Sequence, residues 1–198
     1  MKIKRFKKLS DIKKYVETFN KINGYDIPIS YFTQNKACIR CLVSSEEIKG
    51  GYAIVSGQSR SLEQVPQTFL IKQENNGYLI RYPKNKFLKK EKIAEFTGYF
   101  MLSNEGRFKL TCFLLFDVFT SKAKYFIYSF AVSNKKLAKY YGYGNPIFIY
   151  CGQASKLEGH PSDMESEQVE MLTKVGILKV FLARVFNKYI KGKNASRR

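Results

Sequence analysis

The chain has 198 residues, and its 35 basic and 16 acidic residues give a formal net charge of +19 at pH 7. Hydrophobic residues make up 44% of the sequence and aromatic residues 15%, which predicts a folded globular protein and excludes a disordered one. No apolar run reaches the roughly 18–20 residues of a membrane-spanning helix, and no apolar stretch follows the basic N-terminus as in a signal peptide. We therefore expect one domain, residues 1–190, in a soluble cytoplasmic protein.

The positive charge is concentrated in three lysine-rich clusters, Lys2–Lys14, Lys84–Lys92 and Lys188–Arg198. Such an excess favours polyanionic partners: nucleic acid, an anionic membrane surface or a phosphate-rich cofactor. Solvated faces of a lysine-rich protein explain the same pattern equally well. Lysine greatly outnumbers arginine, whereas specific phosphate and base contacts prefer arginine, so the charge alone favours nucleic acid only weakly.

The four cysteines and the single histidine do not predict a metal site. Cys38 and Cys41 have CxxC spacing, but no second pair completes a zinc site, and residues three apart on a strand face opposite sides. Cys112 and Cys151 lie in apolar segments and are predicted to be buried thiols. His160 lies in a loop sequence and could act as an acid or base, although a lone loop histidine is usually only exposed. We expect no metal cofactor.

The first half of the chain is punctuated by glycine and asparagine into short elements. Apolar spacing predicts a helix over 10–23 that is capped by Ser10 and Asp11 and ended by Gly24. A Gly50-Gly51 break predicts a hairpin. The other expected elements are a strand over 3–6, a short helix over 28–32, the hairpin strands over 37–44 and 51–56, a helical turn over 61–65, and irregular or short-strand structure over 69–82.

The second half contains the longer apolar segments. We expect a strand over 92–102, a turn over 103–106, a largely buried helix over 107–124, a strand over 125–132, a short helix from Asn134, a strand over 146–151, and an amphipathic helix over 165–190. The basic residues 191–198 are expected to form a disordered tail.

The most specific segment runs from Ser133 to Gly144. Asn134 can cap a helix, and Tyr141 lies seven positions later on the same helix face. The glycines at 142 and 144 end the helix before the next strand. A strand, a short Asn-capped helix with a tyrosine near its end, and another strand resemble the last conserved portion of the GNAT-type (Gcn5-related) N-acyltransferases. The resemblance covers residues 1–152, and its specific part is residues 92–150.

The resemblance implies an α+β fold with a mixed, mostly antiparallel central sheet flanked by helices, here with an added C-terminal helix. It also implies roles for three side chains. Glu95 on the central strand would deprotonate the acceptor amine, and Tyr141 would protonate the leaving thiolate. Asn134 would contact the pantetheine arm of the donor. Alternative readings remain: Glu95 paired with a lysine, Tyr141 as a core tyrosine with Tyr140 as a rival acid, and Asn134 as a helix cap only.

The turn after the central strand would hold the pyrophosphate of coenzyme A or acyl-CoA on backbone amides, through Asn104, Gly106, Arg107 and Lys109. A backbone amide near Tyr99–Met101 would bind the thioester carbonyl oxygen. Counted from Arg107, however, Leu110 and Cys112 stand where the family has small residues. This departure leaves open a different donor, such as a carrier-bound or long acyl chain, or a lost activity.

Two functions follow as hypotheses. The first is an acyltransferase that moves an acyl group from acyl-CoA or another acyl thioester to an amine whose identity the sequence does not give, with an anionic acceptor favoured by the charge. The second is a non-catalytic protein of the same fold that binds nucleic acid or another polyanion through its lysines, with aromatic side chains stacking on bases. A partner-binding role for the helix over 165–190 ranks third. Oligomeric state is not readable from the sequence.

Overall fold

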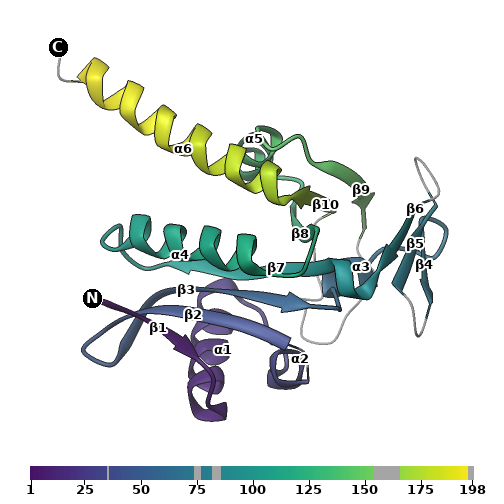
Figure 1. The fold of residues 1–198 in the computed structure, drawn as a ribbon, viewed down its shortest axis with the longest axis horizontal. Coiled ribbons are helices and arrows are strands. Elements are labelled where there is room, and N and C mark those ends of the chain that lie inside the picture. The colour runs from purple at the N-terminus through teal and green to yellow at the C-terminus, as the bar shows by residue number, and fades with distance from the viewer. Residues whose placement is uncertain (35, 74–76, 82–85, 154–165, 196–198) are drawn as a thin grey trace.

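A computed structural model describes residues 1–34, 36–73, 77–81, 86–153 and 166–195, with the side chains of 72–73 and 188–195 left aside. Figure 1 shows a long twisted sheet with α1 and α2 on one face and α4 on the other, and a small second sheet at one end. The described elements are, in chain order, β1 (Lys2–Phe6), α1 (Leu9–Asn23), α2 (Ile29–Thr33), β2 (Lys36–Ser44), β3 (Glu47–Ser56), α3 (Arg60–Glu63), β4 (Leu70–Gln73), β5 (Gly77–Ile80), β6 (Lys86–Lys89), the 3-10 turn η1 (Lys90–Lys92), β7 (Ile93–Met101), α4 (Arg107–Thr120), β8 (Tyr125–Ala131), α5 (Lys135–Gly142), β9 (Ile147–Gly152), β10 (Glu167–Thr173) and α6 (Lys174–Ala195).

The main sheet has the strand order β1-β2-β3-β7-β8-β10-β9, and β4-β5-β6 form the smaller sheet. Every neighbouring pair in the main sheet is antiparallel except β7 and β8, which run parallel. The parallel pair is connected through α4, as a parallel connection requires a crossover. The predicted fold class, a mixed and mostly antiparallel sheet flanked by helices with a C-terminal helix, is therefore confirmed.

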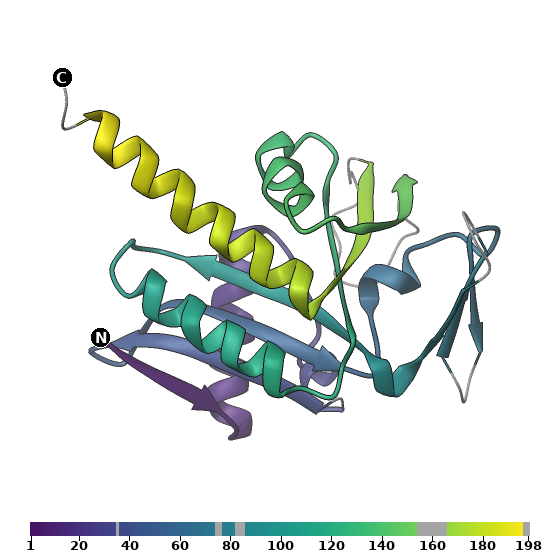
Figure 2. The ribbon, with the colours of Figure 1, turned by 45° about the horizontal axis from the view of Figure 1, so that its top comes forward.

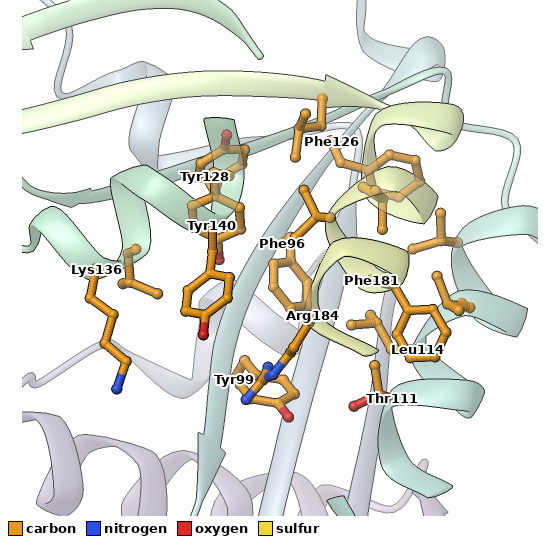
Figure 3. Close-up of a pocket in the computed structure, with 17 residues that line it drawn as sticks. Phe96, Tyr99, Thr111, Leu114, Phe126, Tyr128, Lys136, Tyr140, Phe181 and Arg184 are labelled. Atoms are coloured by element: carbon orange, nitrogen blue, oxygen red, sulfur yellow. The ribbon is translucent and has the colours of Figure 1, made fainter. Parts of the chain in front are cut away.

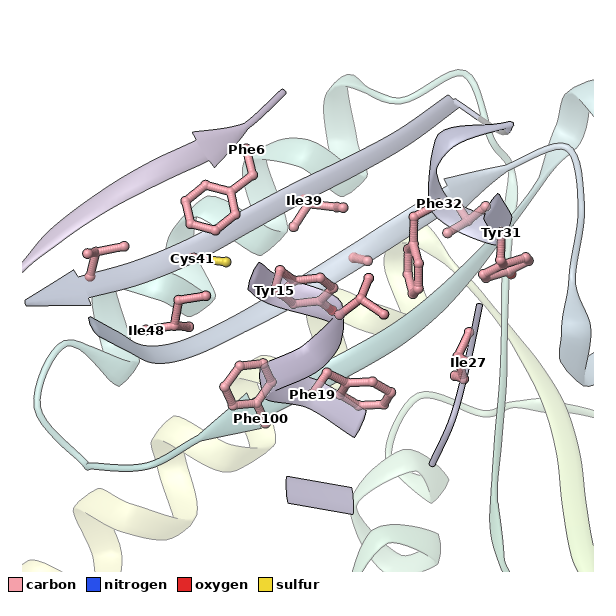
Figure 4. Close-up of a cluster of buried hydrophobic side chains, with 14 residues drawn as sticks. Phe6, Tyr15, Phe19, Ile27, Tyr31, Phe32, Ile39, Cys41, Ile48 and Phe100 are labelled. Atoms are coloured by element: carbon pink, nitrogen blue, oxygen red, sulfur yellow. The ribbon is translucent and has the colours of Figure 1, made fainter. Parts of the chain in front are cut away.

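One core lies between α1, α2 and the sheet. Tyr15 and Phe19 of α1 pack with Phe32 of α2 and Phe100 of β7, and Figure 4 shows these rings converging on one face of the strands. Helix α1 presents this apolar face because its buried residues recur at helical spacing. It ends at Gly24, as predicted, and Gly24 adopts the left-handed conformation common after a helix. The prediction that Ser10 and Asp11 cap this helix was wrong: both lie inside its first turn, and Lys8 is the N-cap residue.

On the opposite face, Asp117 holds α4 to the sheet. Its carboxylate, only 7% exposed, accepts hydrogen bonds from Arg40 Nε at 2.5 Å and Nη2 at 2.7 Å, from the Tyr52 hydroxyl at 2.7 Å and from Cys38 Sγ at 3.3 Å. Burial alone would raise the pKa of Asp117, but these hydrogen bonds lower it on balance. A buried carboxylate with this many donors fixes α4 in one position on the strands.

The prediction that residues 107–124 form a largely buried helix was wrong in extent. Leu110, Leu114 and Val118 face the sheet, whereas Phe108, Phe116 and Phe119 are exposed. Helical spacing puts Leu110, Leu114 and Val118 on one face, and this face is the buried one; the apolar residues outside it suggested wider burial than the helix has.

Two of the cysteine predictions were wrong as well. Cys112 on the outer side of α4 and Cys151 on the edge strand β9 are exposed rather than buried. Cys38 and Cys41 do face opposite sides of β2, as their spacing predicts: Cys41 joins the core under α1 and Cys38 contacts Asp117 of α4. His160 lies outside the described residues.

The first hairpin turns at Ser45-Glu46, not at Gly50-Gly51. Both turn residues have positive φ, 48° and 66°, which is the geometry of a tight two-residue hairpin. The glycines instead lie inside β3, where a Cβ at Gly51 would come within 3.1 Å of the Tyr15 ring. Close packing of α1 on the strand explains Gly51, whereas a Cβ at Gly50 would lie 2.5 Å from Met101 Sδ of β7.

The expected helix over 165–190 was wrong in its first part. Residues Glu167–Thr173 form β10, which is hydrogen bonded to β8 and β9 on its two sides, and α6 begins only at Lys174. The helix then continues to Ala195, into the segment expected to be a disordered tail. Gly144 and Gly176 allow the start of α6 to approach β9, because a Cβ at Gly144 would lie 2.8 Å from the Gly176 carbonyl oxygen. This approach leads α6 along α4 and α5, as Figure 2 shows.

Candidate functional site

The site begins where β7 and β8 separate. Their registered pairs are Ile93–Tyr125, Ala94–Phe126 and Glu95–Ile127, after which no further pair is formed. Just beyond, β7 carries a bulge: Thr97 pairs with Ala53 and Phe100 with Gly51, which leaves two residues of β7 opposite one of β3. A bulge bends its strand and interrupts the ladder, so it opens the sheet between β7 and β8 at this level.

Gly98 makes the bulge possible. Its φ is +67°, and a Cβ there would lie 1.9 Å from the hydroxyl oxygen of Tyr15. That hydroxyl donates a hydrogen bond of 3.0 Å to the Gly98 carbonyl oxygen. Both the left-handed backbone and the close approach of Tyr15 therefore require glycine.

On the α4 side of the opening lies a cavity of about 250 Å³ between β7, β8, β10, α4, α5 and α6. Its two ends differ chemically. Figure 3 shows the apolar side chains Leu114, Phe126 and Phe181 toward one end, and the polar side chains of Tyr99, Tyr140, Lys136 and Arg184 toward the other.

Tyr141 also lines this cavity, at the end of α5. Asn134 begins that helix, and its side-chain oxygen accepts a hydrogen bond of 3.1 Å from the Leu137 amide, so the predicted cap is confirmed. The Tyr141 ring packs 4.2 Å from the Tyr128 ring, centre to centre. Burial and the neighbouring Tyr99 raise the pKa of Tyr141 to about 12, which keeps its hydroxyl protonated at neutral pH. Tyr140 lines the same cavity, so the structure does not separate the two tyrosines by location alone.

Glu95 lies on the opposite face of the opening and is 5% exposed. Its carboxylate accepts hydrogen bonds from the Tyr31 hydroxyl at 2.6 Å, the Arg60 backbone amide at 2.5 Å and the Ser61 hydroxyl at 2.8 Å. Burial raises the pKa of Glu95, and these donors offset part of the rise. These hydrogen-bond donors come from α2 and α3, and they hold the carboxylate of Glu95 at the last pair that β7 and β8 form, Glu95–Ile127.

Glu167 is a second buried carboxylate on this face, and sequence reasoning missed it. It is 4% exposed, and its Oε2 atom has no hydrogen-bond partner among the described residues. Burial raises its pKa, Ser129 lowers it through a hydrogen bond, and the charge of Glu95 raises it again. The Ser61 and Ser129 hydroxyl oxygens lie 3.3 Å apart, so the two serines connect the two carboxylates. The helix predicted over 165–190 concealed this residue, because only a strand would place Glu167 beside Ser129.

The turn over residues 103–106 leads into α4, as predicted. Gly106 is the N-cap residue with φ +73°, and Leu42 of β2 occupies the space that a Cβ there would need, at 2.7 Å. Asn104 and Lys109 are exposed, and Arg107 is half-buried. Leu110 belongs to the core of the domain and Cys112 lies outside, so α4 directs these two bulky residues to different sides.

Three buried polar atoms follow one another from β7 to the first turn of α4: the Tyr99 hydroxyl, Ser103 Oγ and Arg107 Nε. None of them has a hydrogen-bond partner within the part of the chain that the structure describes. Buried polar atoms in folded proteins are nearly always paired, so three in succession mark a place where a polar ligand would find donors. They lie beside the first backbone amides of α4, which a helix does not pair within itself, although the Arg107 amide donates to the Asn104 carbonyl oxygen at 3.3 Å.

The fold and this opening define the class. The chain has the fold of the GNAT-type N-acyltransferases. In this chain the opening between β7 and β8 lies at the centre of the sheet. No protein-family model matches the sequence, and none of the curated proteins matches it.

Solved structures match over nearly the whole chain. FeeM, an N-acyl amino acid synthase from uncultured soil microbes, is 15% identical with a TM-score of 0.56 and covers 93% of this chain and 97% of its own. Arabidopsis thaliana NAA60, solved in complex with acetyl-CoA, is 10% identical with a TM-score of 0.53 and coverage of 87% and 97%. The spermidine N-acetyltransferase SpeG of Vibrio cholerae is 11% identical with a TM-score of 0.51 and coverage of 90% and 98%. At identities this low, the matches establish the fold alone.

Other candidate sites receive less support. Among the described residues, no group of three or more histidine, cysteine or acidic side chains could hold a metal ion, and no helix is long and apolar enough to cross a membrane. The first of the two described lysine clusters lies on β1 and α1, and the second lies on β6 and η1 (Figure 1). A second cavity is lined among others by Arg5 of β1 and Lys90 of η1, so residues of both clusters meet there.

Proposed function

We propose that this protein transfers an acyl group from an acyl thioester to an amine. The observation that carries the proposal is the arrangement around the opening of β7 and β8. A cavity that contains Tyr141 lies on one face, the buried carboxylate of Glu95 lies on the other, and the Gly98 bulge lies between them. A thioester entering from one face and an amine entering from the other would meet at the opening.

The roles follow from the chemistry of the reaction. An amine is protonated at pH 7, so Glu95 first takes one proton from it, directly or through a water molecule. The free nitrogen attacks the carbonyl carbon, and a backbone amide of Tyr99–Met101 stabilises the negative oxygen that forms. As the C–N bond is completed and the C–S bond breaks, Tyr141 donates its proton to the sulfur. The second proton of the attacking nitrogen restores the Tyr141 hydroxyl, and Glu95 releases its proton to solvent.

The donor's phosphates would bind at the start of α4. Free amides at Gly106 and beyond, the Arg107 guanidinium and the exposed Asn104 and Lys109 side chains supply hydrogen bonds and positive charge there. The unpartnered Arg107 Nε fits this role. Asn134 would contact the pantetheine arm from the start of α5. Coenzyme A, where it is the carrier, supplies the thiol that leaves.

The position of the acceptor amine depends on the charges near the opening rather than on the net charge of the protein. The protein carries +19, which favours an anionic acceptor molecule, yet two carboxylates, Glu95 and Glu167, lie buried on the face from which the amine would enter. We therefore place the cationic amine of the acceptor beside these carboxylates, and any negative group of the acceptor away from them.

A direct test incubates the protein with an acyl thioester and a panel of primary amines, and measures thiol release together with amide formation by mass spectrometry. Tyr141→Phe should lower the turnover by about 10²-fold or more while the protein stays folded. Tyr143→Phe is the matched control, because Tyr143 lies at the end of the same helix but is 42% exposed and outside the cavity. Equal turnover by both variants would remove Tyr141 from the mechanism, and Tyr140→Phe would then be the variant to assay.

The alternative function, binding of nucleic acid or another polyanion, is tested by the salt dependence of binding. Binding of nucleic acid through lysines releases counterions, so the affinity should fall steeply between about 50 and 200 mM salt. An affinity that hardly changes over this range would exclude that mode of binding.

A further inference from the structure

The cavity on the α4 side is more apolar than the transfer of a small acyl group needs. Leu114 of α4 and Phe126 of β8 form part of its apolar end, and Val180 and Phe181 of α6 complete it. Tyr141, the residue that we assign to the leaving sulfur, lines the same cavity, packs in one cluster with Val180 and lies near Arg184. A thioester held at Tyr141 would therefore have a hydrocarbon-lined space on one side and a positively charged group on the other.

Helix α6 is held firmly enough to act as a wall. Its first turn packs against Gly144, where a Cβ would lie 3.0 Å from Val180 Cγ2 and 2.8 Å from the Gly176 carbonyl oxygen. Further along, the Phe181 ring lies 6.2 Å from the Phe108 ring of α4, centre to centre. The helix is thus in contact with both sides of the cavity, and the side chains between these contacts bound the space inside.

We propose that the apolar end of this cavity binds the acyl chain of the donor, and that α6 sets the length of chain that fits. The proposal rests on the proposed function for the identity of the ligand as a thioester. A volume of about 250 Å³ is about eight times the ~30 Å³ that one water molecule occupies in the liquid. A methylene group is of similar size, and although the polar end takes part of this volume, the rest has room for several methylene groups, so the donor is a medium-chain acyl thioester rather than an acetyl thioester. Arg184 and Lys136 attract the hydrophilic, phosphate-bearing arm at the other end.

The test measures binding without an acceptor, so that it does not depend on catalysis. S-acyl pantetheines with acetyl, butanoyl, octanoyl and dodecanoyl chains are titrated into the protein by calorimetry, since pantetheine is common to coenzyme A and to carrier-protein donors. Each methylene that enters an apolar site should tighten binding by up to about fourfold. We expect the affinity to rise from acetyl to octanoyl and then to level off. Equal affinities for acetyl and octanoyl thioesters would overturn the proposal.

Two substitutions in α6 should move the limit in opposite directions. Val180→Phe fills the apolar end and should make the affinity level off at a shorter chain, whereas Phe181→Ala enlarges it and should favour dodecanoyl over octanoyl. Phe186→Ala is the control, because Phe186 lies on the same helix, is 62% exposed and does not line the cavity. If both cavity variants stay folded by circular dichroism but keep the wild-type chain-length profile, α6 does not set the length.

The outcome also separates this inference from the proposed function. Chain-length-dependent binding with no transfer to any amine would support the cavity assignment and contradict the acyltransferase. Transfer of acetyl as efficiently as octanoyl would support the acyltransferase and overturn the cavity assignment.

Discussion

Substitution of Gly98 by alanine tests whether the bulge that opens the sheet depends on this glycine. Two costs follow from the structure. Alanine at φ +67° loses about 1–2 kcal/mol relative to the right-handed conformation. Its Cβ would also lie 1.9 Å from the Tyr15 hydroxyl oxygen, and extra atoms in a packed core cost about 1–3 kcal/mol. Gly98→Ala should therefore destabilise the protein by about 2–5 kcal/mol, which lowers the melting temperature by at least about 4 °C in a chain of this size.

A double-mutant cycle with Tyr15→Phe separates the two costs. Tyr15→Phe alone removes the hydrogen bond to the Gly98 carbonyl oxygen and should cost about 1 kcal/mol. In the double variant the hydroxyl is gone, and the nearest remaining atom, the ring Cζ, lies 3.1 Å from the new Cβ. The double variant should then be more stable than the sum of the single effects by at least about 1 kcal/mol, as measured by urea denaturation. Effects that add within about 0.5 kcal/mol would refute the packing argument, and a neutral Gly98→Ala would refute the account of the bulge.

Three further outcomes follow from the buried carboxylates. Asp117→Asn breaks the ion pair with Arg40, which should lower the free energy of unfolding by about 3–5 kcal/mol, as measured by urea denaturation. Because the pKa of Asp117 is lowered, the wild type should lose this extra stability as the pH falls through the range in which carboxyl groups titrate. A stability difference that does not change with pH would contradict this. Glu95→Gln should lower kcat/KM by about 10²–10⁴-fold and abolish the rise of the wild-type rate with pH, since the base must be ionised. Because burial raises the pKa of Glu95, the wild type should also lose stability relative to this variant as the pH rises from about 4.5. Parallel pH–stability curves of the two proteins would contradict the raised pKa. Glu95→Gln also removes the negative charge that raises the pKa of Glu167, so the pKa of Glu167 should fall in this variant; an unchanged pKa in an NMR titration would show that the two carboxylates do not interact.

The sequence predicts the strands from 92 to 102 and 125 to 132, the capped α5 and the turn into α4 well, because each of these carries a local signal: an apolar run, an asparagine cap or a glycine. Local signals fail where distant residues decide the structure. The apolar residues of 167–173 fit a helical period, but pairing with β8 and β9 makes this segment a strand. The glycines at 50 and 51 resemble a turn, but the position of Tyr15 explains Gly51.

The site likewise has residues that the sequence predicts and residues that it does not. Glu95 and Tyr141 were assigned from the resemblance, and the structure places them on the two faces of one opening without testing their roles. Glu167 and the wall formed by α6 could not be predicted, because both depend on how the last third of the chain returns to the sheet. Glu167 lies in the polar stretch Glu165–Gln168, which is ordinary for the start of a solvated helix.

The most direct test of the central claim is a crystal structure of the protein with a non-hydrolysable 2-oxoalkyl thioether analogue of S-octanoyl pantetheine, in which a methylene group stands between the sulfur and the carbonyl carbon. The account predicts that the sulfur lies within hydrogen-bonding distance of the Tyr141 hydroxyl, with the carbonyl carbon at the opening between β7 and β8 and the alkyl chain against Phe126 and Phe181. A sulfur atom bound away from Tyr141, or an alkyl chain outside the cavity, would contradict it.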